Sequence, residues 1–465
     1  MPDFDVGIIG AGPGGYVAAI RAAQLGARVV LVERAELGGV CLNWGCLPTK
    51  ALLHAAGLYQ KIKHANEFGL KVDKAGFDMG AMVARKNDVV AANKKSVAGL
   101  LAAHKIEVVK AEASIPAPGR ILLANQEELN AKAIIVATGA RPAQLPGLTP
   151  DGHRVLTSTE ALDLVELPKR VAIIGAGAIG AEFACLWNAL EVEVTLIEIA
   201  KDILPLADHD LSRRLRSSLR KRGVDVRTGT AVRDASVGDQ GVALELEGKK
   251  GGTVEVDKVL LSVGSIPNAT VGGDNQDLGV ALGAKGEILV NERMETSVKG
   301  IFAIGDVVGK TMLAHGASAE GVVAAQNAVG GNASIDYRVV PSCTFTSPEV
   351  ASVGLTERQA CDADIDVKTG KFSFAATGRA QTMGETEGQV KIVGDATTDE
   401  VLGIHIMGAE AGELVASAAM AMTMEATVEE IAHTIHTHPT LAEAIKEAAE
   451  DYFGIGIHTP PAKPR

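Results

Sequence analysis

The chain opens with an apolar run, a glycine-rich turn and a helical stretch. Residues 4–10 (FDVGIIG) predict a buried strand, residues 16–25 predict a helix, and residues 27–33 (ARVVLVE) predict a second strand that ends in an acid. A strand, a glycine turn and a helix in this order are typical of a nucleotide-binding unit.

The same pattern returns in the middle of the chain. Residues 171–175 predict a strand, a helix extends to position 190, and a further strand ends in an acid at position 198. In both copies this acid follows the first glycine of a G-x-G-x-x-G motif by 23 residues. The motifs and their acids are Gly10, Gly12, Gly15 and Glu33 in the first copy, and Gly175, Gly177, Gly180 and Glu198 in the second.

These residue types match the chemistry of a dinucleotide. The first glycine permits a tight turn, the second lets the backbone approach a pyrophosphate, and the third allows the helix to pack closely on the strand. The pyrophosphate then faces the positive end of a helix, and the acid accepts hydrogen bonds from a ribose diol. One such motif could be an incidental turn in a glycine-rich protein. Two complete units predict two dinucleotide sites.

The remaining pattern predicts further strands and helices. Apolar runs at 133–139 and 301–306 end in small or acidic turns, residues 51–105 have helical periodicity, and residues 107–130 predict short strands. Beyond residue 340 strands precede helices, which indicates an α+β region. The strands expected there are 343–353, 390–393 and 401–407.

The pattern therefore predicts an α/β fold with two Rossmann-like dinucleotide-binding domains and a C-terminal α+β domain. A length of 465 residues is also consistent with about three domains. We expect a first nucleotide domain at 1–148, a second at 149–270, a central segment that completes the first site at 271–340, and the C-terminal domain at 341–465, with a disordered tail from 459.

Charge and hydropathy argue against two classes of partner. The net charge of −12 disfavours a nucleic-acid partner, because such contacts depend mainly on Lys and Arg. No uninterrupted apolar run approaches 18 residues, so no membrane span is expected. The N-terminus passes from Met1 directly into a strand pattern without a signal or transit sequence. We therefore expect a cytoplasmic protein, or a mature form whose leader has been removed.

Five cysteines are too few, and odd in number, for a disulfide scaffold. Cys41 and Cys46 lie in the segment GGVCLNWGCLPTK (residues 38–50), directly after the first nucleotide unit. Pro48 suits the first turn of the helix that follows. Cys46 is then near the positive end of that helix, where a thiolate is stabilised.

Four interpretations of this pair are open. A zinc site needs about four ligands, and the spacing supplies two with no second cysteine pair in the chain, so no metal site is expected. Two structural thiols, or one reactive thiol with an incidental neighbour, are also compatible with the spacing. The position beside a nucleotide site favours a redox-active disulfide.

Six features of the chain occur together in one order. They are the C-x4-C segment, the two glycine motifs, the A-T-G and G-D strand ends at 137–139 and 305–306, and the His-Pro-Thr at 438–440. In this order, and over nearly its whole length, the chain resembles the pyridine nucleotide-disulfide oxidoreductases. The resemblance implies FAD and NAD as cofactors. It is strongest to members that oxidise dihydrolipoyl groups with NAD⁺.

The resemblance implies roles around the flavin. The first unit binds the ADP part of FAD, Asp306 binds the ribityl region, and Ala314 lies beside the ring. The A-T-G strand end adds Thr138 and Gly139 to the expected cofactor contacts.

The resemblance also implies roles for the two thiols. Cys46 is implied to exchange electrons with the flavin, and Cys41 to attack the substrate disulfide. Lys50 follows Cys46 by one helical turn and is implied to lie near the flavin N5, paired with Glu182. A solvated helix lysine is the alternative for Lys50.

The second unit is implied to bind the nicotinamide nucleotide. A carboxylate at Glu198 favours a ribose diol and repels a 2′-phosphate, and no arginine follows until Arg213. NAD is therefore expected rather than NADP, which argues against a glutathione reductase. Gly264 is expected at this site, but Ser265 stands where the family commonly has Arg, so detail of nicotinamide binding is open.

The C-terminal segment carries the expected acid–base group. The resemblance marks His438 as this group, with Glu443 orienting it, and an acid on one ring nitrogen fixes the tautomer. A capping box formed by Thr440 and Glu443 is the structural alternative for that acid. The resemblance also implies a homodimer in which the C-terminal α+β domain is the interface domain and the histidine reaches the disulfide of the other subunit.

The expected reaction is the oxidation of dihydrolipoyl groups by NAD⁺ through a Cys41–Cys46 disulfide and FAD. The implied partners are a lipoyl-bearing acyltransferase of a 2-oxoacid dehydrogenase complex or the glycine-cleavage carrier protein. Two alternatives are open. One is a related NADH-dependent reductase of another small disulfide, and the other is a flavin redox sensor or scaffold with little turnover.

Overall fold

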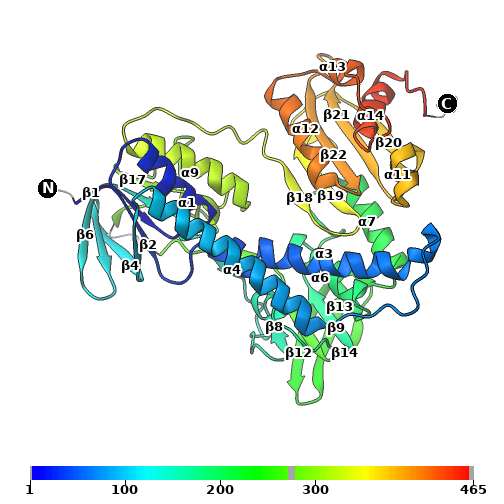
Figure 1. Cartoon of the computed structure of the whole chain (residues 1–465), viewed down its shortest axis with the longest axis horizontal. Coiled ribbons are helices and arrows are strands. Elements are labelled where there is room, and N and C mark those ends of the chain that lie inside the picture. The colour runs from blue at the N-terminus through cyan, green and yellow to red at the C-terminus, as the bar shows by residue number, and fades with distance from the viewer. Residues whose placement is uncertain (1–2, 271–277, 460–465) are drawn as a thin grey trace.

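A computed structural model describes residues 3–270 and 278–459 of the protein. The start of the expected central segment and almost all of the expected disordered tail lie outside the described residues. Figure 1 shows the sheets of the two nucleotide units at the left and bottom, and a third sheet with its helices at the upper right.

The first sheet has the strand order β3-β2-β1-β6-β5-β4, with β17 added beside β6. Buried residues line both of its faces, and the apolar repeat in its central strands explains this. Helices α1 (Pro13–Gln24) and α9 (Ala314–Ala328) pack together on it. The strands are β1 (Phe4–Ile9), β2 (Val29–Glu33), β3 (Glu107–Lys110), β4 (Ala113–Ala117), β5 (Arg120–Leu123), β6 (Glu128–Val136) and β17 (Ile301–Ala303).

The second unit repeats this plan in a parallel sheet of order β11-β10-β9-β15-β8. Helix α6 (Ala178–Ala189) follows its glycine turn, and α7 (His209–Lys221) follows its acid. The strands are β8 (Val155–Leu156), β9 (Arg170–Ile174), β10 (Glu193–Glu198), β11 (Asp225–Thr228) and β15 (Lys258–Leu261). A separate antiparallel sheet flanks it, formed by β12 (Thr230–Gly238), β13 (Gly241–Gly248) and β14 (Gly252–Val256).

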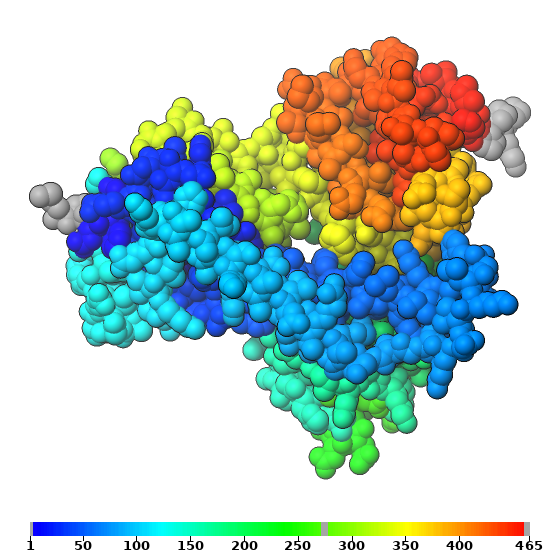
Figure 2. Space-filling model, in the orientation of Figure 1, coloured from blue at the N-terminus to red at the C-terminus, as the bar shows by residue number. Residues whose placement is uncertain are grey.

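Two long helices connect the lobes. Helices α3 (Cys46–Lys63) and α4 (Met79–Ala103) pack on one another, and α3 also packs on α6 of the second unit. Figure 2 shows this pair crossing the face of the molecule between the C-terminal lobe and the second unit. The residues that begin α3 are therefore held where all three parts of the chain come close.

The C-terminal lobe is an antiparallel sheet of order β18-β19-β22-β21-β20 covered by helices. The strands are β18 (Ser342–Thr344), β19 (Glu349–Gly354), β20 (Val367–Ser373), β21 (Gln389–Asp395) and β22 (Val401–Gly408). The helices include α10 (Glu357–Asp362), α12 (Ala411–Thr423), α13 (Val428–His433) and α14 (Glu443–Phe453). The predicted α/β fold with a C-terminal α+β domain is confirmed.

Two details of the prediction are wrong. Residues 343–353 form two strands rather than one, because the chain turns before Pro348, which cannot donate to a sheet. Helix α1 begins at Pro13 rather than at position 16, since proline is favoured in a first turn. Among the described residues, no helix is both long and apolar enough to cross a membrane.

Candidate active site

The two glycine motifs form nearly identical turns. Gly10 and Gly175 have φ of +102° and +98°, a region that residues with a side chain rarely adopt. A side chain at either position would also meet the backbone of the neighbouring strand end, at Ala137 or Ser262. Gly15 and Gly180 have the third role predicted, because each packs against the carbonyl group of its first glycine.

The two acids accept hydrogen bonds from the backbone of these turns. The N–H of Ala11 donates to Glu33 Oε2, and the N–H of Ala176 donates to Glu198 Oε2, both at 2.7 Å. Glu198 is 8% exposed, so its carboxylate is fixed at the edge of the turn. Both acids therefore lie at the carboxyl ends of their strands, where a ribose would approach.

The second glycine of each motif tests whether a nucleotide fits. Gly12 and Gly177 have ordinary φ values of −65° and −70°. A methyl group added at either position would have no atom of the described residues within 4 Å. Packing within the protein therefore does not require glycine there. A pyrophosphate lying against the backbone does require it, and the positive ends of α1 and α6 face the same space.

The A-T-G strand end is joined to the segment after β15. Thr138 Oγ1 donates to the carbonyl oxygen of Asn268 at 2.7 Å, and the Asn268 side-chain amide donates back to Thr138 O at 3.0 Å. Gly139 has φ +68° and accepts a hydrogen bond from Asn268 N–H. Ser265 is exposed in the short strand β16 (Ser265–Pro267), which begins directly after Gly264.

The G-D strand end provides a polar group for a ligand. Asp306 lies in the single turn η2 (Gly305–Val308), and burial raises the pKa of its carboxyl above the ordinary value. Within residues 3–270 and 278–459 no group donates a hydrogen bond to this carboxylate. Ala314 is the first residue of α9. A half-buried carboxylate of this kind fits a ligand that carries hydroxyl groups.

Sequence reasoning missed Glu320, which supports this turn. Glu320 is 1% exposed, accepts the N–H of Gly305, and accepts the hydroxyl of Tyr337 at 2.7 Å. Burial raises the pKa of Glu320. Glu320 is the single acid in the sequence of α9, AHGASAEGVVAAQNA, and this was the available signal.

The two cysteines of the C-x4-C segment form a disulfide. Cys41 lies in α2 (Gly39–Trp44), and Cys46 is the first residue of α3. Pro48 is in the first turn of α3, as predicted. Both cysteines are half-buried, so neither is distinguished by exposure in the single chain.

One turn further along α3, Lys50 meets groups from two other domains. Lys50 Nζ lies 2.8 Å from each carboxylate oxygen of Glu182, on α6. Glu182 also accepts the N–H of Phe345, from the C-terminal lobe, at 2.9 Å. The ammonium group lies 4.8 Å from the centre of the Phe345 ring. Phe345 had no recognisable signal in the sequence, because the main-chain N–H makes its hydrogen bond.

His438 and Glu443 are brought together. His438 Nδ1 lies 2.8 Å from Glu443 Oε1, and the imidazole is 77% exposed. Burial alone would raise the pKa of Glu443, but hydrogen bonds from Thr440 N–H and from His438 hold it below its ordinary value. Only one half of the capping box is formed. The N–H of Thr440 donates to Glu443 Oε2 at 2.8 Å, but the Thr440 hydroxyl donates to the carbonyl oxygen of Thr437, and α14 begins at Glu443 itself.

Within one chain the histidine is remote from the disulfide. Figure 1 shows α13 and α14, which flank His438, at the outer end of the C-terminal lobe, whereas α3 runs below that lobe.

Two of the other three cysteines lack the features of reactive thiols. Cys185 is buried, which raises the pKa of its thiol to about 11, and burial also raises the pKa of Cys343. Cys361 is exposed. His433 is exposed and His436 is half-buried.

The chain matches two family descriptions. Residues 4–321 match "Pyridine nucleotide-disulphide oxidoreductase", and residues 340–449 match the dimerisation domain of the same group.

Relatives that match over most of their length are named dihydrolipoyl dehydrogenase or leghemoglobin reductase. The chain is 47% identical to a dihydrolipoyl dehydrogenase of Thermus scotoductus, with 98% of this chain and 99% of that protein covered. It is 42% identical to the mitochondrial dihydrolipoyl dehydrogenase of Pisum sativum, with 98% and 92% covered. It is also 42% identical to a leghemoglobin reductase of Glycine max, with 96% and 87% covered.

Solved structures agree on the fold. LpdA of Mycobacterium tuberculosis superposes with a TM-score of 0.88 at 30% identity, covering 96% of this chain and 99% of that one. The HOCl-induced flavoprotein disulfide reductase RclA of Escherichia coli superposes with a TM-score of 0.85 at 28% identity, covering 97% and 99%.

Proposed function

The chain belongs to the pyridine nucleotide-disulphide oxidoreductase family, and we propose that it oxidises protein-bound dihydrolipoyl groups with NAD⁺. The observation that carries the proposal is the position of the Cys41–Cys46 disulfide. It lies at the start of α3, one turn before the Lys50–Glu182 ion pair that joins the first nucleotide unit to the second. The full-length relatives named dihydrolipoyl dehydrogenase support this choice of substrate.

FAD and NAD are the cofactors of the proposed reaction. Gly10, Gly12, Gly15 and Glu33 would hold the ADP part of FAD, and Asp306 would hold its ribityl hydroxyl groups. Thr138, Gly139 and Ala314 would line the same site. The second site would use Gly175, Gly177, Gly180, Glu198 and Gly264. When bound, FAD supplies two-electron chemistry that returns the cysteine pair to a disulfide at the expense of NAD⁺.

The protein's own thiols perform the exchange with substrate. A thiolate of the dihydrolipoyl group attacks Cys41 Sγ, which breaks the Cys41–Cys46 bond and releases Cys46 as a thiolate. The second substrate thiol then attacks the mixed disulfide, which closes the lipoyl ring and releases Cys41. The positive end of α3 stabilises the Cys46 thiolate, since Cys46 is the first residue of that helix.

A base must take protons from the substrate thiols. We assign this role to His438, whose free Nε2 can accept a proton while Glu443 holds Nδ1. The match of residues 340–449 to the dimerisation domain supports a homodimer. We propose that His438 of one subunit serves the disulfide of the other, because α13 and α14, which flank His438, lie at the outer end of the C-terminal lobe of their own chain (Figure 1).

Mixed dimers test this shared site. A Cys46→Ser subunit and a His438→Gln subunit should each be nearly inactive as homodimers, with His438→Gln lowering turnover by about 10²–10⁴. Paired in one heterodimer, they should regain one working site. If the heterodimer is as inactive as the two variant homodimers, the active site is not shared between subunits.

The wider setting forms part of the proposal. We divide the chain into an FAD-binding part at 1–148, an NAD-binding domain at 149–270, a central segment at 271–340 and a dimerisation domain at 341–465. The proposed partner is a lipoyl-bearing acyltransferase or the glycine-cleavage carrier protein. The proposed location is the cytoplasm, where a reducing environment suits a catalytic rather than a structural disulfide.

Steady-state assays of the holoenzyme decide the reaction. Dihydrolipoamide with NAD⁺ should give the highest kcat/KM, and dihydrolipoamide with NADP⁺ a lower one. Glutathione disulfide with NADH should give a low kcat/KM. A preference for another small disulfide would replace the proposed substrate, and negligible turnover with every pair would indicate a redox sensor.

A further inference from the structure

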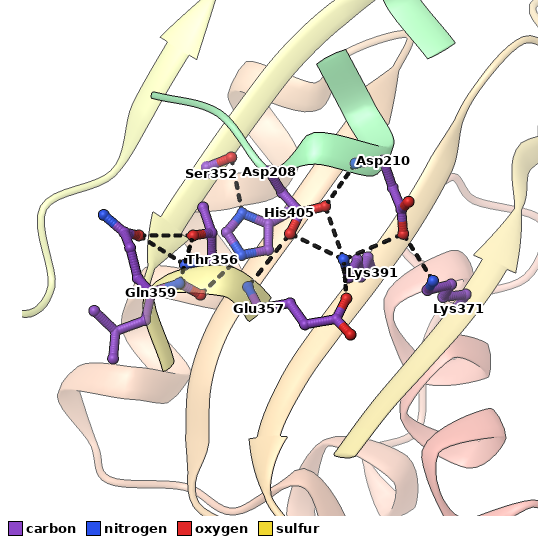
Figure 3. A network of polar contacts seen from close by, with 10 residues as sticks. Asp208, Asp210, Ser352, Thr356, Glu357, Gln359, Lys371, Lys391 and His405 are labelled. Carbon is purple, nitrogen blue, oxygen red and sulfur yellow. Dashed lines mark hydrogen bonds and ion pairs between the residues drawn. The ribbon is translucent and has the colours of Figure 1, made fainter. Parts of the chain in front are cut away.

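A buried lysine of the C-terminal lobe reaches the second nucleotide unit. Lys391, on β21, has a side chain that is 2% exposed, and its Nζ lies 2.8 and 2.9 Å from the two carboxylate oxygens of Asp208. Asp208 is equally buried and immediately precedes α7 of the second unit (Figure 3). A buried ion pair is weak evidence of net stability, because desolvation offsets the attraction.

Further charges surround the pair. Lys391 Nζ lies 3.2 Å from a carboxylate oxygen of Asp210 and 2.6 Å from one of Glu357, and Lys371 also pairs with Asp210. Burial alone would lower the pKa of Lys391, but its carboxylate partners outweigh this and hold the pKa above the ordinary value. Lys391 is thus a charged group with three acidic partners, and the acids come from both domains (Figure 3).

The neighbouring imidazole is neutral. His405 is fully buried, which lowers its pKa. Its Nε2 donates to the carbonyl oxygen of Leu355, so Nδ1 accepts the hydroxyl of Ser352, both at 3.0 Å. Lys391 is therefore the cation that neutralises Asp208 at this contact.

Hydrogen bonds continue from Asp208 into the second unit. Asp208 caps α7, since its carboxylate accepts the N–H of Asp210 at 3.0 Å and its carbonyl oxygen accepts the N–H of Ser212 at 3.0 Å. The Ser212 hydroxyl donates to the carbonyl oxygen of Leu204 at 3.2 Å. The N–H of Leu204 donates in turn to the carbonyl oxygen of Ala176 at 2.8 Å.

Ala176 lies inside the glycine turn, between Gly175 and Gly177. Its N–H also binds Glu198, the acid expected to contact the ribose. The loop that delivers Leu204 needs support, because Leu204 has φ +45°, a left-handed conformation that is unfavourable for a branched side chain. The hydrogen bonds of Leu204 with Ser212 and Ala176 hold it in this conformation.

We propose that Lys391 is a positioning residue of the NAD site. It acts from the C-terminal domain by fixing Asp208, and through α7 and Ser212 it fixes the loop that supports the glycine turn and Glu198. This inference rests on the proposed function for the identity of the nucleotide. It predicts that loss of Lys391 weakens NAD⁺ binding while flavin content and the KM for the dithiol stay unchanged.

Titration of the oxidised holoenzyme with NAD⁺ by calorimetry tests the proposal directly. Lys391→Met should raise the Kd for NAD⁺ by about 2- to 30-fold, the usual range for residues that couple to a site through others. Lys391→Arg keeps the charge and should recover part of this loss. In turnover, the KM for NAD⁺ should rise in Lys391→Met and the KM for dihydrolipoamide should not.

Ser212→Ala interrupts the same path with little risk to folding and decides the question if Lys391→Met does not fold. Ser218→Ala is its matched control, because Ser218 is a buried serine on the same helix whose hydroxyl donates to Glu387 instead. Lys86→Met controls for loss of a buried lysine, since Lys86 pairs with Asp163 away from the path. Both controls should leave NAD⁺ affinity unchanged.

Several results would overturn the proposal. Equal effects of Ser212→Ala and Ser218→Ala on NAD⁺ affinity would do so, as would full additivity of Lys391→Met and Ser212→Ala, because two steps of one path must couple. A wild-type protein that does not oxidise dihydrolipoamide would overturn the proposed reaction, and the NAD⁺ titration would still decide the role of Lys391. A wild-type protein that does not bind NAD⁺ would overturn both.

Discussion

The two nucleotide units have the same turn in different surroundings. In each unit, the alanine after the first glycine donates its N–H to the acid at 2.7 Å. In each unit, the carbonyl oxygen of that alanine accepts an N–H from the loop after the acid at 2.8 Å, from Gly38 in the first and Leu204 in the second. The motif thus specifies a complete local structure, including the return of the chain.

The surroundings differ at the start of the helix. In the first unit α9 packs against α1, and Gly14 lies so close to the Ala317 carbonyl group that a Cβ there would be 3.0 Å from it. The equivalent position in the second unit is Ile179, which is 45% exposed. The first turn is therefore enclosed by a later part of the chain, and the second is open to solvent.

With these different surroundings, one motif can serve two kinds of ligand. An enclosed turn suits a nucleotide that stays bound through many turnovers, as we propose for FAD. An open turn suits a nucleotide that must enter and leave in each cycle, as we propose for NAD. The chain after the acid differs as well, because it continues to the Cys41–Cys46 disulfide in the first unit and to Asp208 and Lys391 in the second.

The largest expected effect concerns the disulfide, which only the first unit carries. Cys46→Ser should lower dihydrolipoamide oxidation by at least about 10³-fold, because the exchange requires both sulfur atoms. In the reduced wild type, a Cys46 thiolate beside oxidised flavin should give a red-shifted charge-transfer band. Cys46→Ser should abolish this band, whereas Cys41→Ser should retain it. If both variants keep the wild-type spectrum, the assignment of the two thiols is wrong.

The same substitution in both units should separate their functions. Gly12→Ala should lower FAD binding and Gly177→Ala should lower NAD⁺ binding, each by on the order of 10- to 100-fold, since a methyl group would occupy the pyrophosphate position. Both residues have backbone angles that alanine adopts easily and open space beside them, so the variants should fold.

Flavin absorbance and NAD⁺ titration measure these two outcomes. Gly99→Ala, on α4 with open space around it, is a control that should change neither. Normal binding in both motif variants would show that these turns do not hold the nucleotides.

The choice between NAD and NADP should be a smaller effect. We expect kcat/KM to favour NAD⁺ over NADP⁺ by at least about tenfold, or 1.4 kcal/mol, because a 2′-phosphate near Glu198 would meet a like charge. Glu198→Ala combined with Lys201→Arg should narrow the gap. Equal efficiency with the two nucleotides in the wild type would contradict the role of Glu198.

The smallest effect concerns acid stability at the contact between the second unit and the C-terminal lobe. Burial alone would raise the pKa of Asp210, but Lys371 and Lys391 lower it from 3.8 to about 2. A lowered pKa stabilises the folded protein fully above about pH 4, and this contribution is lost as the pH falls towards 2. Asp210→Asn should flatten the pH dependence of stability in that window.

Tryptophan fluorescence can follow this transition, because Trp187 is buried in α6 of the second unit. The same loss of stability between pH 4 and pH 2 in Asp210→Asn as in the wild type would assign acid sensitivity to other carboxyl groups.

The main features could be predicted from the sequence because they depend on local chemistry. The turns at Gly10 and Gly175 need positive φ, and the acids 23 residues later close them, so the motif predicted both units. Pro48 located the start of α3 and therefore the helix position of Cys46. These features depend on residues close together in the chain, where steric and hydrogen-bonding rules leave few alternatives.

The sequence determined that there are two nucleotide turns and one adjacent thiol pair. The tertiary structure decided which turn is enclosed, because that depends on α9 returning to α1 from nearly 300 residues away. It also decided the pairing of Asp208 with Lys391, which are 183 residues apart, and the support of Gly305 by Glu320. A single acid or lysine in a strand or helix has many possible partners, and only the packing of whole domains selects one of them and removes water from around it.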